Sequence, residues 1–195
     1  MVIQLRDDDA PIHESGPIEP FPISTDYVQI QAGFGRGSAE LGIPTANVPL
    51  KKLPQQLQEE GFSSGIYFGF AKLKPVTGKD TQYIGRPNDP DAKVEFNYGQ
   101  CLKKEEIEKP IPVVFSVGYN VFYGDLTEKV VELHFLHHFD ENFYGSLVKF
   151  TVLGYIRPER NYPSLDELIK AINTDKEITR KALALKNFQM YKDVI

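Results

Sequence analysis

Apolar and polar residues alternate with a period of two in several stretches of the chain, as in half-buried β-strands. In YVQIQAG, Val28, Ile30 and Ala32 fall on one face, and Gln29 and Gln31 fall on the other. Four longer stretches are also predicted as strands: GIYFGFAKL (65–73), PVVFSVGY (112–119), KVVELHFLHHF (129–139) and SLVKFTVLGYI (146–156). Many strands separated by turns, with no helices alternating between them, indicate an antiparallel barrel or sandwich.

The apolar period becomes helical near the C-terminus, where Leu165, Leu168, Ile169 and Ile172 recur at helical spacing. Capping-box pairs precede LDELIKAI and ITRKALAL, namely Ser164 with Glu167 and Thr174 with Glu177. We therefore expect two helices that pack an apolar stripe against the β-structure.

Two segments depart from these patterns. Residues 1–24 hold four prolines and three consecutive aspartates, which is typical of an extended arm. The folded domain is expected over residues 25–190, interrupted by a polar excursion at about 75–112 that contains one strand near KVEFNYG. We find no internal repeat.

Composition narrows the classes of partner. The chain has 195 residues and a net charge of −5 without a block of Lys or Arg, which disfavours a nucleic-acid partner. Its one cysteine, Cys101, fits a reducing compartment, such as the cytoplasm. No apolar run reaches the ~20 residues of a membrane span, so no membrane partner is expected. A monomer is the default expectation.

The stretch GFGRGS resembles a phosphate-binding loop, although it lacks the lysine that follows the glycines of a P-loop. Gly33, Gly35 and Gly37 would let backbone N–H groups converge on an anion, and Arg36 could add a charge-assisted contact. A flexible interstrand loop is the simpler interpretation, because glycine usually marks a turn.

Thr45 and Asn47 follow in PTAN, two residues apart, so their oxygens point the same way if the segment is extended. Hard oxygen donors suit Mg²⁺, which takes its other ligands from water and substrate phosphates.

Glu132 lies on the strand face opposite Val131 and Leu133. A carboxylate among apolar neighbours is a candidate general base, because partial burial can raise its pKa; a solvent-facing glutamate is the simpler interpretation. His134 and His138 are about 13 Å apart on a strand at ~3.3 Å per residue, so a zinc cluster is rejected.

Arg157, Arg160 and Tyr162 lie where a strand ends and a helix begins, in GYIRPERNYPSLDEL. They could hold a ligand by charge and by stacking, or they could form an ordinary surface turn.

Together these stretches resemble the riboflavin kinases of the eukaryotic, monofunctional type. The matching segments are GFGRGSAELGIPTAN, SSGIYFG, VELHFLH, ENFYG and GYIRPERNYPSLDELIKAI, in the family's order over about residues 27–185. The resemblance implies a closed antiparallel β-barrel of about six strands with C-terminal helices packed on it. It also implies transfer of the ATP γ-phosphate to the 5′-hydroxyl of riboflavin, which yields FMN.

The resemblance further implies a role for each candidate residue. Glu132 would be the general base, and Thr45 and Asn47 would hold Mg²⁺, with Zn²⁺ or another divalent ion as the alternative. The ATP site would comprise Gly33, Gly35, Arg36, Gly37, Ser38, Thr45, Asn47, Phe135, His137 and Tyr144. The riboflavin site would comprise Arg157, Arg160 and Tyr162.

Ala39 departs from the family, since relatives often carry a lysine there, and the excursion is longer than in compact relatives. A bifunctional enzyme that also adenylylates FMN would need a further domain, for which 195 residues leave no room. A non-catalytic flavin or nucleotide carrier remains the alternative, but it would need neither the metal pair nor Glu132. An oligonucleotide-binding barrel conflicts with the acidic charge.

Overall fold

The computed structural model describes residues 12, 14–33, 45–59, 62–87, 89–119 and 129–195. Residues 34–44, which carry most of the glycine-rich stretch, and residues 1–11 and 13 of the predicted arm lie outside this range. The arm's end enters the fold, because Ile23–Ser24 forms strand β1 and the Phe21 side chain is buried.

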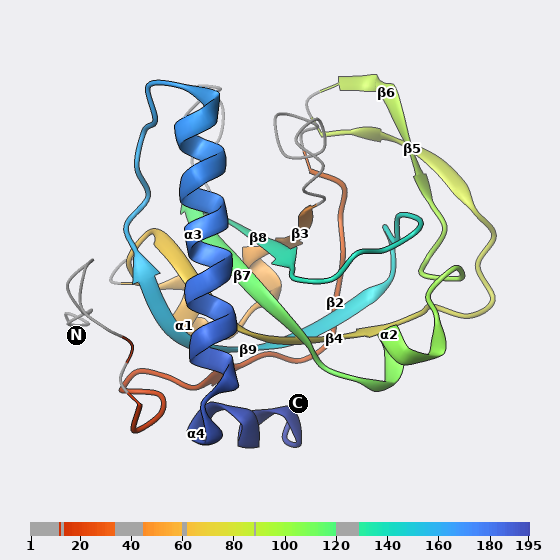
Figure 1. Ribbon diagram of the computed structural model, residues 1–195. Helices are drawn as coiled ribbons and strands as arrows, with labels where there is room; N and C mark the ends of the chain where they lie inside the picture. Colours follow the sequence, from red (N-terminus) through yellow and green to blue (C-terminus); the bar gives the residue numbers. More distant parts are fainter. Residues whose placement is uncertain (1–11, 13, 34–44, 60–61, 88, 120–128) are drawn as a thin grey trace.

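One antiparallel sheet of seven strands forms the centre of the described chain (Figure 1). Its order is β1-β9-β4-β7-β8-β3, and β2 also pairs with β9. The strands are β1 (Ile23–Ser24), β2 (Val28–Gln29), β3 (Thr45–Pro49), β4 (Gly65–Lys74), β7 (Ile111–Tyr119), β8 (Lys129–Phe135) and β9 (Leu147–Arg157). The predicted mainly-β antiparallel class is thus confirmed, and the predicted alternation of Val28, Ile30 and Ala32 is confirmed by their burial.

The excursion at 75–112 folds into a separate hairpin and a short helix. The hairpin pairs β5 (Gln82–Arg86) with β6 (Asp89–Phe96), which contains the strand predicted near KVEFNYG. Helix α2 (Lys104–Glu108) follows and leads into β7. Two short helical turns, η1 (Leu50–Lys52) and α1 (Gln55–Gln58), lie between β3 and β4.

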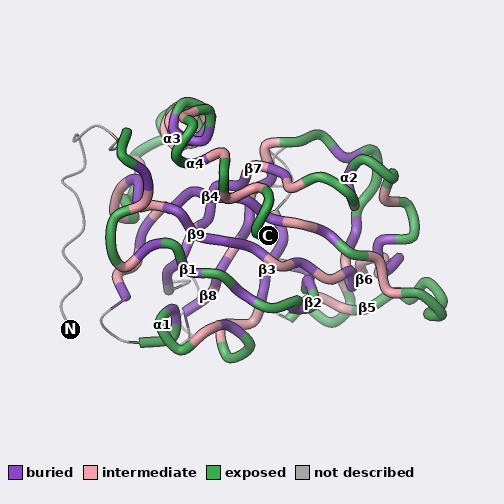
Figure 2. The backbone as a smooth tube through the Cα atoms, turned by 90° about the horizontal axis from the view of Figure 1, so that it is seen from below, coloured by how far each residue is buried: buried purple, intermediate pink, exposed green. Residues whose placement is uncertain are grey.

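Apolar residues on the two faces of the sheet form two core clusters. The larger cluster lies inside the curved sheet and includes Tyr67, Phe115 and Phe150. In the smaller cluster, outward-facing residues of β4 and β9 contact the C-terminal helices, with Phe68 meeting Phe188. Figure 2 shows the buried strands at the centre and α3 on the outside, exposed along much of its surface.

The C-terminal helices divide differently from the prediction. Helix α3 runs unbroken over Leu165–Ala184, followed by α4 (Lys186–Gln189) and η3 (Met190–Lys192). Ser164 caps α3 as predicted and accepts a hydrogen bond from the Glu167 N–H at 3.3 Å. The second capping box is wrong, because Thr174 lies inside α3 and its hydroxyl donates to the Lys170 carbonyl at 3.0 Å.

The predicted apolar stripe of α3 also needs correction. Leu165 is 56% exposed, whereas Thr179, Ala182 and Leu183 are buried. The helix therefore packs on the sheet through its C-terminal half. Its N-terminal half, with Leu168 and Ile172, borders a pocket instead.

Gly69 permits the closest approach of two central strands. A Cβ atom at this position would overlap the Thr151 carbonyl of β9, at a register shift between Phe68 and Gly69. Only glycine fits there without moving the backbone.

Candidate active site

Three neighbouring strands place polar side chains on one face of the sheet. Glu132 of β8 lies directly opposite Asn47 of β3 on one side and Ser116 of β7 on the other. Residues directly opposite in an antiparallel pair have Cβ atoms about 4.5–5.5 Å apart. Asn47, Glu132 and Ser116 therefore form a row across three strands, although they are far apart in the sequence.

The next row along these strands continues the same face. His134 lies opposite Thr45 of β3 and Val114 of β7. The backbone of Thr45 is part of β3, and its side chain lies outside the described part of the structure. The predicted metal pair and the predicted base thus come from adjacent strands.

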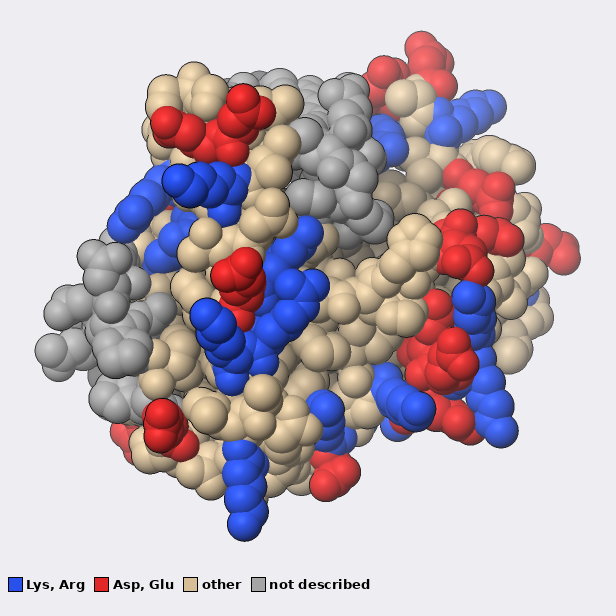
Figure 3. All heavy atoms as spheres, in the orientation of Figure 1, with Lys and Arg blue, Asp and Glu red and all other residues tan. Residues whose placement is uncertain are grey.

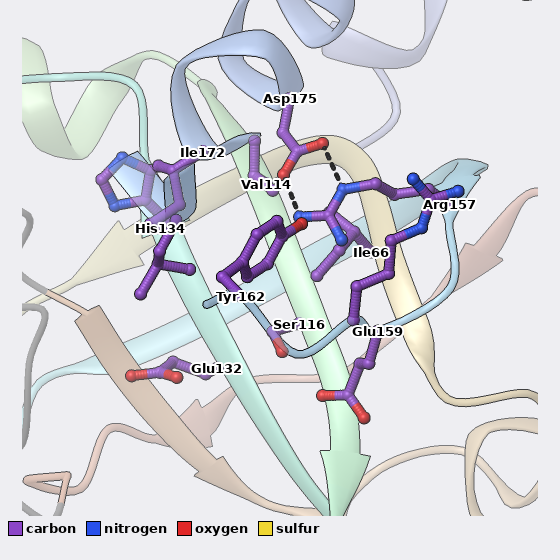
Figure 4. A pocket seen from close by; sticks show the side chains of 12 residues that line it. Ile66, Val114, Ser116, Glu132, His134, Arg157, Glu159, Tyr162, Ile172 and Asp175 are labelled. Carbon is purple, nitrogen blue, oxygen red and sulfur yellow. Dashed lines mark hydrogen bonds and ion pairs between the residues drawn. The ribbon is translucent and has the colours of Figure 1, made fainter. Parts of the chain in front are cut away.

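A cavity of about 260 Å³ opens beside these rows, between the sheet and α3 (Figure 4). Its floor comes from β7 and β8, with Ser116, Glu132 and His134. Its far wall comes from the end of β9, the segment that follows it, and α3 as far as Asp175. That wall is formed by Arg157, Glu159, Arg160, Tyr162, Leu168, Ile172 and Asp175.

Arg157 is fixed in the cavity wall by a two-pronged ion pair with Asp175 of α3. Its Nε donates to Oδ1 at 2.9 Å and its Nη2 donates to Oδ2 at 2.7 Å. The side chains are only 13% and 4% exposed. The guanidinium also lies 5.7 Å from the centre of the Tyr162 ring. Figure 4 shows the pair beside the Tyr162 ring at the wall of the cavity.

Burial dominates the electrostatics of the two carboxyl groups on this wall. It raises the pKa of Asp175, and the hydrogen bond and charge of Arg157 offset this only in part. Burial also raises the pKa of Glu159, against a hydrogen bond from Ser116 and the charge of Arg157. Glu159 lies close to the β7 backbone, because a Cβ atom on Gly118 would overlap its carboxylate.

Asn47 combines burial with an unused polar group. Its backbone exchanges hydrogen bonds with Gln31, at 2.8 Å and 3.4 Å, and the residue is 7% exposed. Its Nδ2 atom is buried without a hydrogen-bond partner among the described residues. A buried polar group left unsatisfied costs about 1–3 kcal/mol, so this amide is suited to a bound ligand.

Besides Thr45 and Asn47, four of the predicted nucleotide residues are described by the structure. Gly33 contacts the Asn47 amide, since a Cβ atom on Gly33 would overlap Nδ2. Phe135 is buried at the end of β8, and His137 lies just beyond it with a 37% exposed side chain. The ring of Tyr144 lies 5.8 Å from that of Phe96 in the excursion. The predicted Gly35, Arg36, Gly37 and Ser38 lie outside the described residues.

Ser116, Glu159 and Asp175 also line the cavity, and sequence reasoning did not single them out. Glu159 lies in GYIRPER, a segment that carries the family resemblance, and this is the signal that could have identified it. Ser116 and Asp175 carry no such signal, because only strand register and helix packing bring them to the cavity. Among the described residues, no group of three or more His, Cys, Asp or Glu side chains could hold a metal, and no helix is long and apolar enough to cross a membrane.

A family model and several curated relatives match most of this chain. The family model described as "Flavokinase: Riboflavin kinase" matches residues 22–183. A riboflavin kinase of Eremothecium gossypii is 48% identical, over 95% of this chain and 96% of its own length. That of Saccharomyces cerevisiae is 45% identical, over 96% of this chain and 84% of its own.

A solved structure shares the fold at lower identity. The riboflavin kinase of Trypanosoma brucei superposes with a TM-score of 0.56 at 24% identity, covering 89% of this chain and 88% of its own. At that level the likeness concerns the fold alone. The family model and the fungal relatives reach further, and they show that this chain belongs to the riboflavin kinase family.

Proposed function

We propose that this chain transfers the γ-phosphate of ATP to the 5′-hydroxyl of riboflavin, giving FMN and ADP. The observation that carries the proposal is the row of Asn47, Glu132 and Ser116 beside the cavity. It sets an oxygen donor for a metal next to a carboxylate that can accept a proton. Such a pair is useful where a hydroxyl group attacks a metal-bound phosphate.

The cavity is the proposed riboflavin site. Two apolar surfaces face each other across the cavity and suit a flat aromatic ring system. One comprises Ile66 and Val114 of the sheet, and the other includes Ile172 of α3. Tyr162 can stack on such a ring, and Arg157 and Arg160 offer donors to its polar edge. Because the Asp175 pair orients Arg157, its donors are directed before a ligand arrives.

Glu132 is the proposed general base. Glu132 lines the cavity (Figure 4), and strand pairing sets it directly opposite Asn47. From there it can take the proton of the attacking hydroxyl. General bases of this kind contribute about 10²–10⁴-fold to the rate, so positioning and charge stabilisation must supply the rest.

Asn47 and Thr45 are the proposed holders of Mg²⁺, with Zn²⁺ or another divalent ion as the alternative. The buried, unsatisfied amide of Asn47 fits this role, because an amide turned the other way presents its oxygen. A divalent ion bound there would supply positive charge against the charge that develops on the phosphate oxygens. ATP would then bind through Gly33, Phe135, His137 and Tyr144, together with Gly35, Arg36, Gly37 and Ser38.

We infer that the sheet closes into the barrel expected for the family. Support comes from the β2 segment, which pairs with β9 at Val28 and reaches β3 through a bridge between Gln31 and Asn47. Closure of this kind would hold Asn47 from two sides, by Gln31 and by Glu132. A monomer with the domain at 25–190, in the cytoplasm or another reducing compartment, stays our prediction.

The test is direct. Purified protein incubated with riboflavin, ATP and Mg²⁺ should form FMN and ADP, as measured by chromatography. The Glu132→Gln variant should lose about 10²–10⁴-fold in kcat while it still binds MgADP. Glu177→Gln, an exposed site on α3, serves as the matched control. Riboflavin binding without FMN formation by the wild type would favour the non-catalytic carrier instead.

A second variant pair tests the metal site. Asn47→Leu removes the oxygen donor at similar volume and should raise the Mg²⁺ concentration for half-maximal rate at least tenfold. Asn47→Asp keeps an oxygen donor and should need less Mg²⁺ than Asn47→Leu. An equal Mg²⁺ requirement in both variants and the wild type would refute this metal assignment.

A further inference from the structure

The excursion at 75–112 lies on the side of the sheet away from α3 (Figure 1). The riboflavin cavity is bordered by α3, so the excursion stands opposite that part of the site. Several of its contacts with the rest of the chain fall on residues that our proposed function assigns to ATP.

Arg86, the last residue of β5, interacts with two of these proposed ATP residues, Gly33 and Tyr144. Its Nη1 donates to the Gly33 carbonyl at 2.6 Å. Burial raises the pKa of the Tyr144 hydroxyl, and the nearby Arg86 guanidinium offsets this rise in part. A guanidinium presents five N–H donors in a fixed planar fork, so it can hold both partners at once. A lysine ammonium has no such fixed geometry.

Residues just after β6 hold the loop that carries Tyr144. The Tyr98 N–H donates to the Tyr144 carbonyl at 2.9 Å, and the Asn97 Nδ2 donates to the Asn142 carbonyl at 2.6 Å. Phe96 adds an aromatic contact with the Tyr144 ring. The excursion thus contacts Tyr144 through its backbone and its ring, and the charge of Arg86 acts on its hydroxyl.

Glu106 of α2 contacts a third proposed ATP residue, His137. The residue is 3% exposed, and its Oε2 accepts a hydrogen bond from the Lys103 N–H at 2.7 Å. Its Oε1 lies 3.0 Å from the Nε2 of His137. An ionised carboxylate only accepts hydrogen bonds, so Nε2 must carry the proton and the ring orientation is fixed.

Glu106 is the buried glutamate of α2. The other two glutamates of α2, Glu105 and Glu108, are exposed, and Figure 3 shows acidic and basic side chains interspersed on this side of the molecule. Burying a carboxylate is costly unless it is fully hydrogen-bonded. Glu106 meets that condition through the Lys103 backbone and His137.

We propose that the excursion is a clamp that positions the adenine nucleotide, with Arg86 and Glu106 as its positioning residues. Arg86 acts through Gly33 and Tyr144, and Glu106 acts through His137. The inference rests on the proposed function, because that function assigns these three residues to ATP. It adds that the nucleotide side of the site depends on a segment outside the main sheet.

The clamp makes nucleotide binding separable from riboflavin binding. Arg86→Ala should raise the Kd for MgADP about tenfold, measured by calorimetry on the full chain, because the Gly33 carbonyl loses its donor and Tyr144 loses a neighbouring cation. Arg86→Lys should fall between Arg86→Ala and the wild type. Glu106→Gln, which can pair with either tautomer of His137, should raise the same Kd about threefold. The Kd for riboflavin, from flavin fluorescence, should stay within twofold in all three.

Matched controls exist on the same segment. Lys93→Ala on β6 and Glu108→Gln on α2 alter exposed charges and should leave both Kd values unchanged. Unchanged MgADP binding in Arg86→Ala would overturn the clamp. A parallel rise of the Kd values for MgADP and riboflavin in Arg86→Ala, together with a lowered Tm, would also overturn it. That result would show that Arg86 has a purely structural role. If Arg86→Ala does not fold, Arg86→Lys decides, and wild-type nucleotide affinity in it overturns the clamp.

The outcomes also separate the clamp from the proposed function. Wild-type protein that forms FMN, with unchanged MgADP affinity in Arg86→Ala, would leave the function standing and remove the clamp. Wild-type protein that forms no FMN, with weakened MgADP affinity in Arg86→Ala, would remove the function and support the clamp.

Discussion

The ion pair between Arg157 and Asp175 should position a ligand more than it stabilises the fold. Replacing Asp175 by Asn keeps the shape of the side chain but leaves one acceptor oxygen where two now bind Arg157. One charge-assisted hydrogen bond is lost, worth about 1.5–3 kcal/mol. Asn also removes the cost of burying a carboxylate, and burial is the larger influence on the pKa of Asp175.

The two effects should nearly cancel, as they often do for buried ion pairs. We expect Asp175→Asn to change the free energy of unfolding by no more than about 1 kcal/mol. Asp175→Ala removes both carboxylate acceptors from the buried Arg157 guanidinium. Because Arg157 keeps 13% of its side chain exposed, we take the low end of the usual cost, about 3 kcal/mol. For a chain of this size, that lowers Tm by about 6–12 °C.

Urea unfolding followed by far-UV circular dichroism would measure both variants, since the chain has no Trp for fluorescence. Both should weaken riboflavin binding, because Arg157 loses its fixed orientation. An equal loss in the free energy of unfolding for Asp175→Asn and Asp175→Ala would refute the reasoning. The negative charge of Asp175 would then itself be stabilising.

The pH dependence has a definite sign. The folded pKa of Asp175 is raised above 3.8, so its contribution to stability is fully present below that value and is lost as pH rises through the folded pKa. The wild type should therefore gain stability relative to Asp175→Asn between pH 7 and pH 4. A loss over that range would contradict the burial argument.

Three further changes test the fold and the cavity wall. Gly69→Ala should cost about 3 kcal/mol in urea unfolding, because the new methyl group overlaps the Thr151 carbonyl; a loss below about 1 kcal/mol would contradict the close approach of these strands. Ser164→Ala should cost about 1 kcal/mol through loss of the α3 cap, and no change in unfolding would argue against that hydrogen bond. The Glu159 carboxyl should titrate above pH 4.5 by NMR, because burial raises its pKa. In Ser116→Ala the pKa of Glu159 should be higher still, because the serine hydroxyl that lowers it is removed; a lower pKa in the variant would refute the contact.

Local patterns predicted much of the fold. Alternation located the long strands, and Ser164 marked the start of α3, because both signals depend on nearby residues alone. The second capping box failed for a tertiary reason. Thr174 could have begun a new helix, but burial of Thr179 and Leu183 against the sheet favours one continuous helix through it.

The candidate site was only half predictable. Glu132 and Asn47 could be chosen by residue type and by the family resemblance. Ser116 and Asp175 could not, because strand register and the placement of α3 bring them to the cavity. The sequence predicts the excursion only as a polar insertion, because its contacts with Gly33, Tyr144 and His137 join segments far apart in the sequence.

The pairing of β8 with its neighbours has a consequence for how this chain can evolve. Side chains of a strand alternate between faces, so Glu132 faces the site while Val131 and Leu133 are buried. Inserting or deleting one residue in β8 would turn Glu132 into the core and bring an apolar side chain to the site. The alternation of side chains along β8 therefore sets both the position of the proposed base and the buried interior, so we expect sequence change in this strand to be restricted to substitutions.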